Sequence, residues 1–114
     1  MNKKRVRLDP FLIKAIAERR ATGMTIKQIA EELGFNPISF SNWKKEARTL
    51  EKRVQGGENI FSDNLSAVRR KYQVNLLNLM GAIREAEKKY LLSVEEEFEK
   101  AISEVSKDEN GKTD

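Results

Sequence analysis

The chain has 114 residues, of which 35% are charged and 7% aromatic, and its formal net charge at pH 7 is +4. A chain of this length has room for one compact domain, or for a small domain with an appendage that needs support from elsewhere. It contains no cysteine and no histidine. Disulfides, thiolate metal sites and histidine-based acid–base catalysis are therefore excluded.

The charge is distributed unevenly along the chain. Residues 1–50 hold 11 basic and 5 acidic side chains, whereas residues 51–114 hold 11 and 13. A basic front and an acidic rear indicate a head that binds a polyanion and a rear segment that avoids polyanions or meets a basic partner. The basic start is not followed by an apolar stretch of signal-peptide length. We therefore expect a cytoplasmic protein without a membrane span.

Three helix starts are visible in the front half. Two prolines each follow an Asx residue that can cap a helix, in Asp9-Pro10 and Asn36-Pro37, and proline suits the first helical position. The third start has the capping-box spacing Thr25-x-x-Gln28. These signals predict helices over residues 9–20, 25–33 and 37–48, the last of which can extend a little beyond residue 48.

The segment 26–45 has the pattern of a helix-turn-helix. This motif needs a small residue where its helices cross, a residue that tolerates positive φ in the turn, and apolar side chains that hold the second helix on the first. Ala30 and Gly34 meet the first two needs. The expected apolar core consists of Ile26, Ile29, Leu33, Phe35, Phe40 and Trp43, completed by Phe11, Leu12, Ala15 and Ile16 of the first helix.

The other face of the third predicted helix is short, polar and basic, as a DNA-reading surface needs to be. Asn42 has the donor and acceptor to pair with adenine, Ser39 and Ser41 suit base edges or phosphates, and Ile38 suits a thymine methyl. An ordinary solvated helix face is the alternative. Phosphate contacts are expected from Lys27, Lys44, Lys45 and Arg48, and from the N-terminal arm with Lys3, Lys4, Arg5 and Arg7.

The rear half predicts a linker followed by helix. Residues 51–61 contain Gly56-Gly57 among polar residues, and from 62 to 106 apolar residues recur every three or four positions. Gly81 and the capping-box pattern Ser93-Val-Glu-Glu96 are candidate breaks. We favour a helical hairpin over a single rod of about 65 Å. Residues 107–114 predict a disordered acidic tail.

A segment of this size cannot bury enough surface to be stable alone. We expect residues 62–106 to form an oligomerisation domain, so that deleting 62–114 leaves a soluble monomer; packing of the stripe on the front helices is the open alternative. A basic triplet, Arg69-Arg70-Lys71, is most simply solubilising charge, with a DNA-facing surface as the alternative. The predicted oligomerisation residues are Leu65, Val68, Tyr72, Leu76, Leu79, Met80, Ile83, Tyr90, Val94 and Phe98.

The stretch Ile29-Ala-Glu-Glu-Leu-Gly34, the Asn-Pro-x-Ser cap and Trp43-Lys-Lys resemble the helix-turn-helix of small terminase subunits of tailed bacteriophages and of many transposases. The order of helix-turn-helix, linker, helical segment and acidic tail favours the terminase family. That resemblance implies a ring that recognises viral genome DNA for packaging in the host cytoplasm and regulates a large terminase subunit with ATPase and nuclease activity.

The sequence thus predicts an all-α, oligomeric, non-enzymatic protein that binds double-stranded DNA and needs no cofactor or metal. A transposase-associated or transcriptional protein, acting as a parallel coiled-coil dimer, is the second hypothesis. A protein adaptor without DNA affinity is the third. The molecular mass in solution separates the first two, and DNA binding at low salt tests the third.

Overall fold

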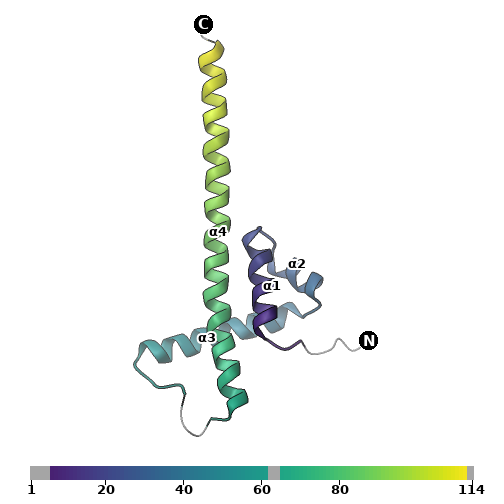
Figure 1. Ribbon diagram of the computed structural model, residues 1–114, viewed down its shortest axis with the longest axis vertical. Coiled ribbons are helices and arrows are strands. Elements are labelled where there is room, and N and C mark those ends of the chain that lie inside the picture. The colour runs from purple at the N-terminus through teal and green to yellow at the C-terminus, as the bar shows by residue number, and fades with distance from the viewer. Residues whose placement is uncertain (1–5, 62–64, 113–114) are drawn as a thin grey trace.

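The computed structural model describes residues 6–61 and 65–112, with side chains as far as residue 106. Four helices make up the described chain, which contains no strand: α1 (Pro10–Ala21), α2 (Ile26–Leu33), α3 (Pro37–Gln55) and α4 (Ala67–Lys112). Figure 1 shows three shorter helices gathered around one part of a long rod. The predicted all-α fold class is confirmed.

The helix starts lie where the capping residues predict them. Asp9 and Asn36 each accept a hydrogen bond from a backbone N–H of the first turn, and each is followed by proline. Thr25 and Gln28 form both hydrogen bonds of a capping box. Because these bonds satisfy donors that the helices leave unpaired, they localise the starts of α1, α2 and α3 without tertiary help.

The turn between α2 and α3 has the geometry of a helix-turn-helix. Gly34 adopts the left-handed conformation, with φ +82°, and ends α2. Ala30 is fully buried at the helix crossing, and Phe35 packs against Trp43 with ring centroids 5.8 Å apart. Ile29 and Phe40 are buried as predicted, but Phe11, expected in the core, is 85% exposed because Ile13 and Ile16 occupy the inner face of α1.

The favoured hairpin is wrong, because α4 is one uninterrupted helix of 46 residues. It continues through both Gly81 and Ser93 and gives the molecule its 76 Å length. Glycine inside a helix costs only about 1 kcal/mol, which many flanking helical residues outweigh. A capping-box pattern cannot start a new helix where the preceding backbone is already helical.

Two expected boundaries also differ. α3 ends at Gln55, so residues 51–55 of the predicted linker belong to this helix, and residues 56–66 connect it to α4. α4 ends at Lys112, so the backbone of residues 107–112, expected as a disordered tail, is helical.

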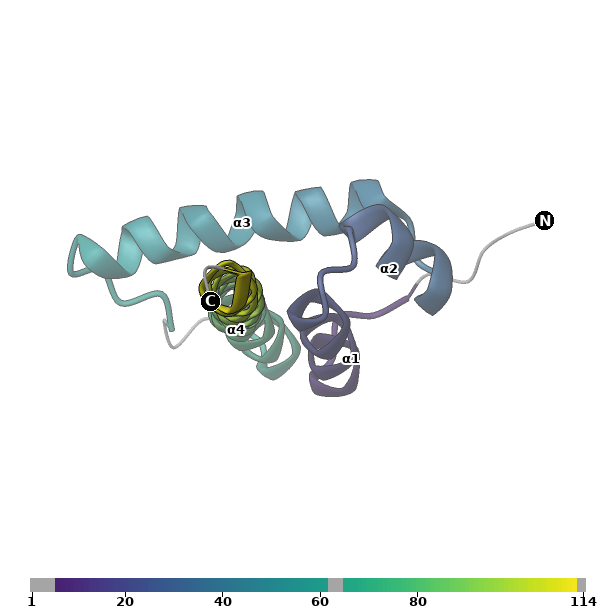
Figure 2. The ribbon, with the colours of Figure 1, turned by 90° about the horizontal axis from the view of Figure 1, so that it is seen from above.

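The first half of α4 completes the core of the front helices. Leu76, Leu79, Met80 and Ile83, predicted to join subunits, are at most 4% exposed and pack with the cores of α1, α2 and α3. Figure 2 shows α3 passing one side of α4 while α1 lies beside another. The alternative in which the stripe packs on the front helices therefore holds for this half. Leu65, Tyr72 and Tyr90 are half-buried, whereas Val68, Val94 and Phe98 are exposed.

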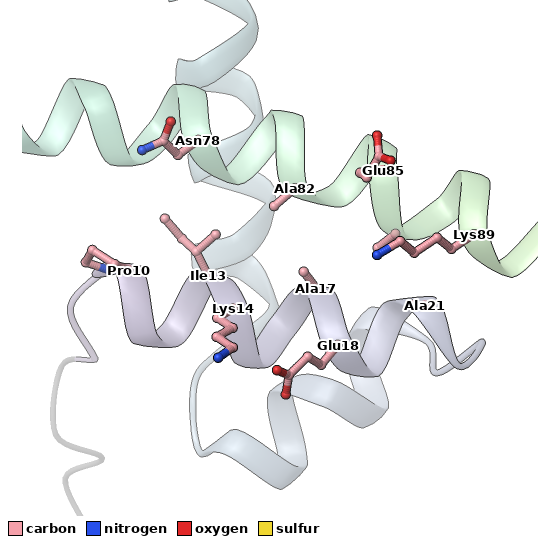
Figure 3. Close-up of a pocket in the computed structure, with 11 residues that line it drawn as sticks. Pro10, Ile13, Lys14, Ala17, Glu18, Ala21, Asn78, Ala82, Glu85 and Lys89 are labelled. Atoms are coloured by element: carbon pink, nitrogen blue, oxygen red, sulfur yellow. The ribbon is translucent and has the colours of Figure 1, made fainter.

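Small side chains let α1 lie close to α4. Ala17 and Ala82 face each other across a groove between the two helices, and charged side chains such as Lys14 and Glu85 line its outer parts (Figure 3). An ion pair of 3.6 Å joins Arg20 to Glu87 farther along. α1 is thus held along α4 by apolar contact and charge. No helix in the described chain is both long and apolar enough to cross a membrane.

Candidate nucleic-acid interface

Helix α3 has one face in the core and the opposite face in solvent. Phe40, Trp43, Ala47 and Leu50, spaced three or four residues apart, are buried. Ile38, Ser41, Lys45 and Arg48 have the same spacing and are exposed, as is Asn42, which follows Ile38 by four residues. Residues with this spacing lie on one side of a helix. The predicted base-reading side chains therefore form one outward surface, which we call the recognition face.

Two predicted contact residues lie at the margin of this surface. Ser39 is half-buried, because it lies about a quarter turn from Ile38 toward the core. Lys44 is half-buried as well, and its Nζ lies 5.8 Å from the centre of the Phe40 ring. A cation over an aromatic ring is held by the ring's negative face. Lys44 thus lies along one edge of the recognition face.

The recognition face continues beyond the residues that the sequence predicted. Thr49 follows Lys45 by four residues, Lys52 follows Arg48 by four, and both are exposed. Their spacing was visible in the sequence. Thr49 and Lys52 were nevertheless not predicted as part of this face, because the third helix was expected to end near residue 48. In the structure α3 continues for two further turns.

Helix α4 holds α3 from behind, at both edges of its buried face. Tyr72 donates a hydrogen bond of 2.9 Å from its hydroxyl to Glu46, and Arg84 donates two, of 2.5 and 2.8 Å, to Glu51. The bonds from Arg84 hold the pKa of the Glu51 carboxyl below its ordinary value. Burial, together with the bond to Glu46, raises the pKa of Tyr72 to about 12. Both groups therefore keep their bonding forms at neutral pH.

The remaining predicted DNA contacts come from other segments. Lys27 is exposed in the first turn of α2, and Arg7 is exposed just before α1. Asn75 of α4 donates a buried hydrogen bond of 3.0 Å to the carbonyl of Leu8, which fixes the base of the N-terminal arm. Lys3, Lys4 and Arg5 lie outside the described residues.

The arrangement of the motif agrees with a comparison against known families. Residues 2–99 match the model of a helix-turn-helix family described as Transposase. The chain belongs to this transposase family. No curated protein and no solved structure matches it. The match covers the helix-turn-helix and most of α4 together, as expected if both belong to one folded unit.

Membership in the transposase family makes the chain a helix-turn-helix DNA-binding protein. The family match supports the DNA-binding property that the two resemblances share, and it does not single out the small terminase subunits. In this motif the second helix is the one that enters the major groove. In this chain that helix is α3, whose outward surface is the recognition face.

Proposed function

We propose that this protein recognises a DNA sequence for a transposition system and carries no catalytic activity of its own. The observation that carries the proposal is the recognition face, an exposed polar and basic surface on the second helix of the motif. Of the other three helices, α2 and α4 contact α3, and the side chains of the recognition face remain exposed. A helix free along one side has the shape that the major groove admits.

Side chains of the recognition face, together with Lys27 of α2, divide into two roles. Ile38, Ser41 and Asn42 lie in the first turns of α3, where a recognition helix meets base edges. Asn42 is the side chain with the donor and acceptor to select adenine. Lys45, Arg48 and Lys27 carry charge suited to phosphates, which position a protein on DNA without reading its sequence.

The second half of α4 is where we propose that two copies meet. Leu91, Val94, Phe98, Ile102 and Val105 are 43–66% exposed and follow one another by three or four residues, so they form one apolar stripe. A single helix-turn-helix makes few base contacts, and joining two raises the effective concentration of the second on the DNA. A second copy is thus the occupant that the proposed function requires.

Genome packaging with a large terminase subunit is the other candidate. The resemblance places ring formation in a helical hairpin, whereas α4 is a single rod of which only the outer half is free. This difference favours the transposase-associated dimer. Light scattering after size exclusion separates the two: a particle of twice 13.1 kDa supports the dimer. A mass of about eight or more protomers would instead support the ring.

DNA binding is tested by fluorescence anisotropy with random and selected duplexes at two salt concentrations. Asn42→Ala should reduce the preference for the selected site by about 1–3 kcal/mol, while Lys45→Ala should weaken binding to all duplexes alike. Lys100→Ala removes the same charge from the exposed half of α4 and serves as the matched control. If the unaltered protein binds no duplex at low salt, the proposed function is wrong.

A further inference from the structure

The major groove is bounded by two phosphate backbones, so a helix lying in it meets phosphates along both edges. On one edge of the recognition face, Lys44, Arg48 and Lys52 form a row with steps of four residues. The sequence assigned no cationic phosphate contact to the other edge. That edge is marked by Asn42, Thr49 and Arg53, which lie farther around the helix from the first row.

The structure brings a cation from α4 to this second edge. A hollow of about 290 Å³ lies between the C-terminal half of α3 and the first turns of α4, and Thr49, Arg53 and Arg69 line it together. Arg69 comes from the basic triplet for which the sequence favoured solubilising charge and left a DNA-facing surface as the alternative. Sequence alone gives no reason to place residue 69 beside residue 49, because the two belong to different helices.

The described lining of this hollow holds two cations, Arg53 and Arg69, and one carboxylate, that of Glu46. Glu46 is the acidic residue among its described lining, and its carboxylate already accepts the hydrogen bond from Tyr72. Arg53 forms two hydrogen bonds with Glu58, of 2.9 and 2.8 Å, which occupy part of its donor set. Arg69 is exposed and its side chain forms no ion pair within the described residues. Arg69 is thus the cation most available to an incoming phosphate.

We propose that Arg69, supported by Arg53 and Thr49, binds the DNA backbone on the second edge of the recognition face. Helices α3 and α4 together would then contact both phosphate backbones that bound the groove. This proposal rests on the proposed function, because it names a further contact with the same duplex. It makes the first turns of α4 part of the DNA-binding surface.

The test measures the salt dependence of binding to a random duplex for Arg69→Gln and Lys71→Gln. Lys71 is exposed, lies two residues away and points to a different side of α4, so it is a matched control for charge. Each phosphate contact contributes about 0.9 to the slope of log affinity against log salt. Between 50 and 200 mM salt, Arg69→Gln should therefore lose about threefold less affinity than the unaltered protein. Lys71→Gln should lose as much affinity over this salt range as the unaltered protein does.

A second pair of variants tests the role of Arg53. Glu58→Gln frees the Arg53 guanidinium, whereas Glu99→Gln removes the same charge from the exposed half of α4. Binding should tighten severalfold more for Glu58→Gln than for Glu99→Gln. If the protein binds DNA but the two variants of each pair behave alike, the second-edge contact is wrong and the proposed function stands. If the protein binds no duplex, the proposed function itself fails.

Discussion

The two halves of α4 are continuous in backbone and opposite in environment. From residue 67 to 90 the helix packs against α1 and α3 and buries Leu76, Leu79 and Ile83. From residue 91 to 106 every residue is exposed, although apolar side chains recur at the same spacing. Figure 1 shows the second half extending beyond the three front helices. An apolar stripe on a helix thus predicts that another surface covers the stripe. The stripe does not show whether that surface belongs to the same chain or to another chain.

Truncating the chain before or after the first half of α4 should produce the largest effect. A chain ending at residue 61 loses the apolar side chains that α4 adds to the core, so we expect it to lose most of its helicity and its cooperative thermal transition. A chain ending at residue 90 should retain both and behave as a monomer. Circular dichroism melts and light scattering check this pair. A well-folded chain of 61 residues would restore the division into two separate domains expected from the sequence.

Single substitutions repeat the comparison on a smaller scale. Leu79→Ala removes a fully buried side chain and should lower the free energy of unfolding by about 2–5 kcal/mol. Phe98→Ala, at a site 66% exposed, should change the stability of the dilute monomer by less than about 0.5 kcal/mol. It should instead weaken self-association. Urea denaturation and sedimentation measure the two properties, and equal effects on stability would contradict the contrast between the halves.

Gly81 tests whether the halves form one rod. It is exposed inside α4, and a Cβ there meets nothing within 4 Å. Gly81→Ala should therefore stabilise the protein by about 1 kcal/mol. Gly34 also has open space, but its φ of +82° disfavours any Cβ, so Gly34→Ala should destabilise by about 1 kcal/mol. Loss of stability in Gly81→Ala would indicate a break at that residue.

The smallest expected effect concerns the link between α4 and the recognition helix. Because the Glu51 pKa is lowered in the folded chain, the stabilisation by Arg84 is complete above the ordinary carboxyl pKa near 4.5. It is lost as pH falls through the lower, folded-state pKa. Arg84→Gln should therefore reduce stability at pH 7 slightly and remove this part of the acid dependence. Thermal melts from pH 7 to pH 3 measure the difference, and parallel curves for both proteins would contradict it.

The front helices could be predicted well because their signals are local. Asp9, Thr25 and Asn36 satisfy backbone donors within three residues of themselves, and Gly34 supplies a backbone conformation that other residues avoid. The recognition face could be predicted as far as Arg48 because its side chains share one helix. Thr49 and Lys52 were missed because the linker was expected to begin at residue 51, whereas Gly56 and the left-handed Gly57, with φ +82°, mark the end of α3.

Sequence by itself determined the helical class, the helix starts, the turn at Gly34 and the polar character of α3, since each follows from bonds or periodicity within a few residues. Tertiary structure alone decided that α4 is unbroken, that its first half fills the core of the front helices, and that Arg69 lies beside Thr49. The reason is physical. An apolar stripe is stabilised by any surface that excludes water from it, and only the packed chain shows which surface that is.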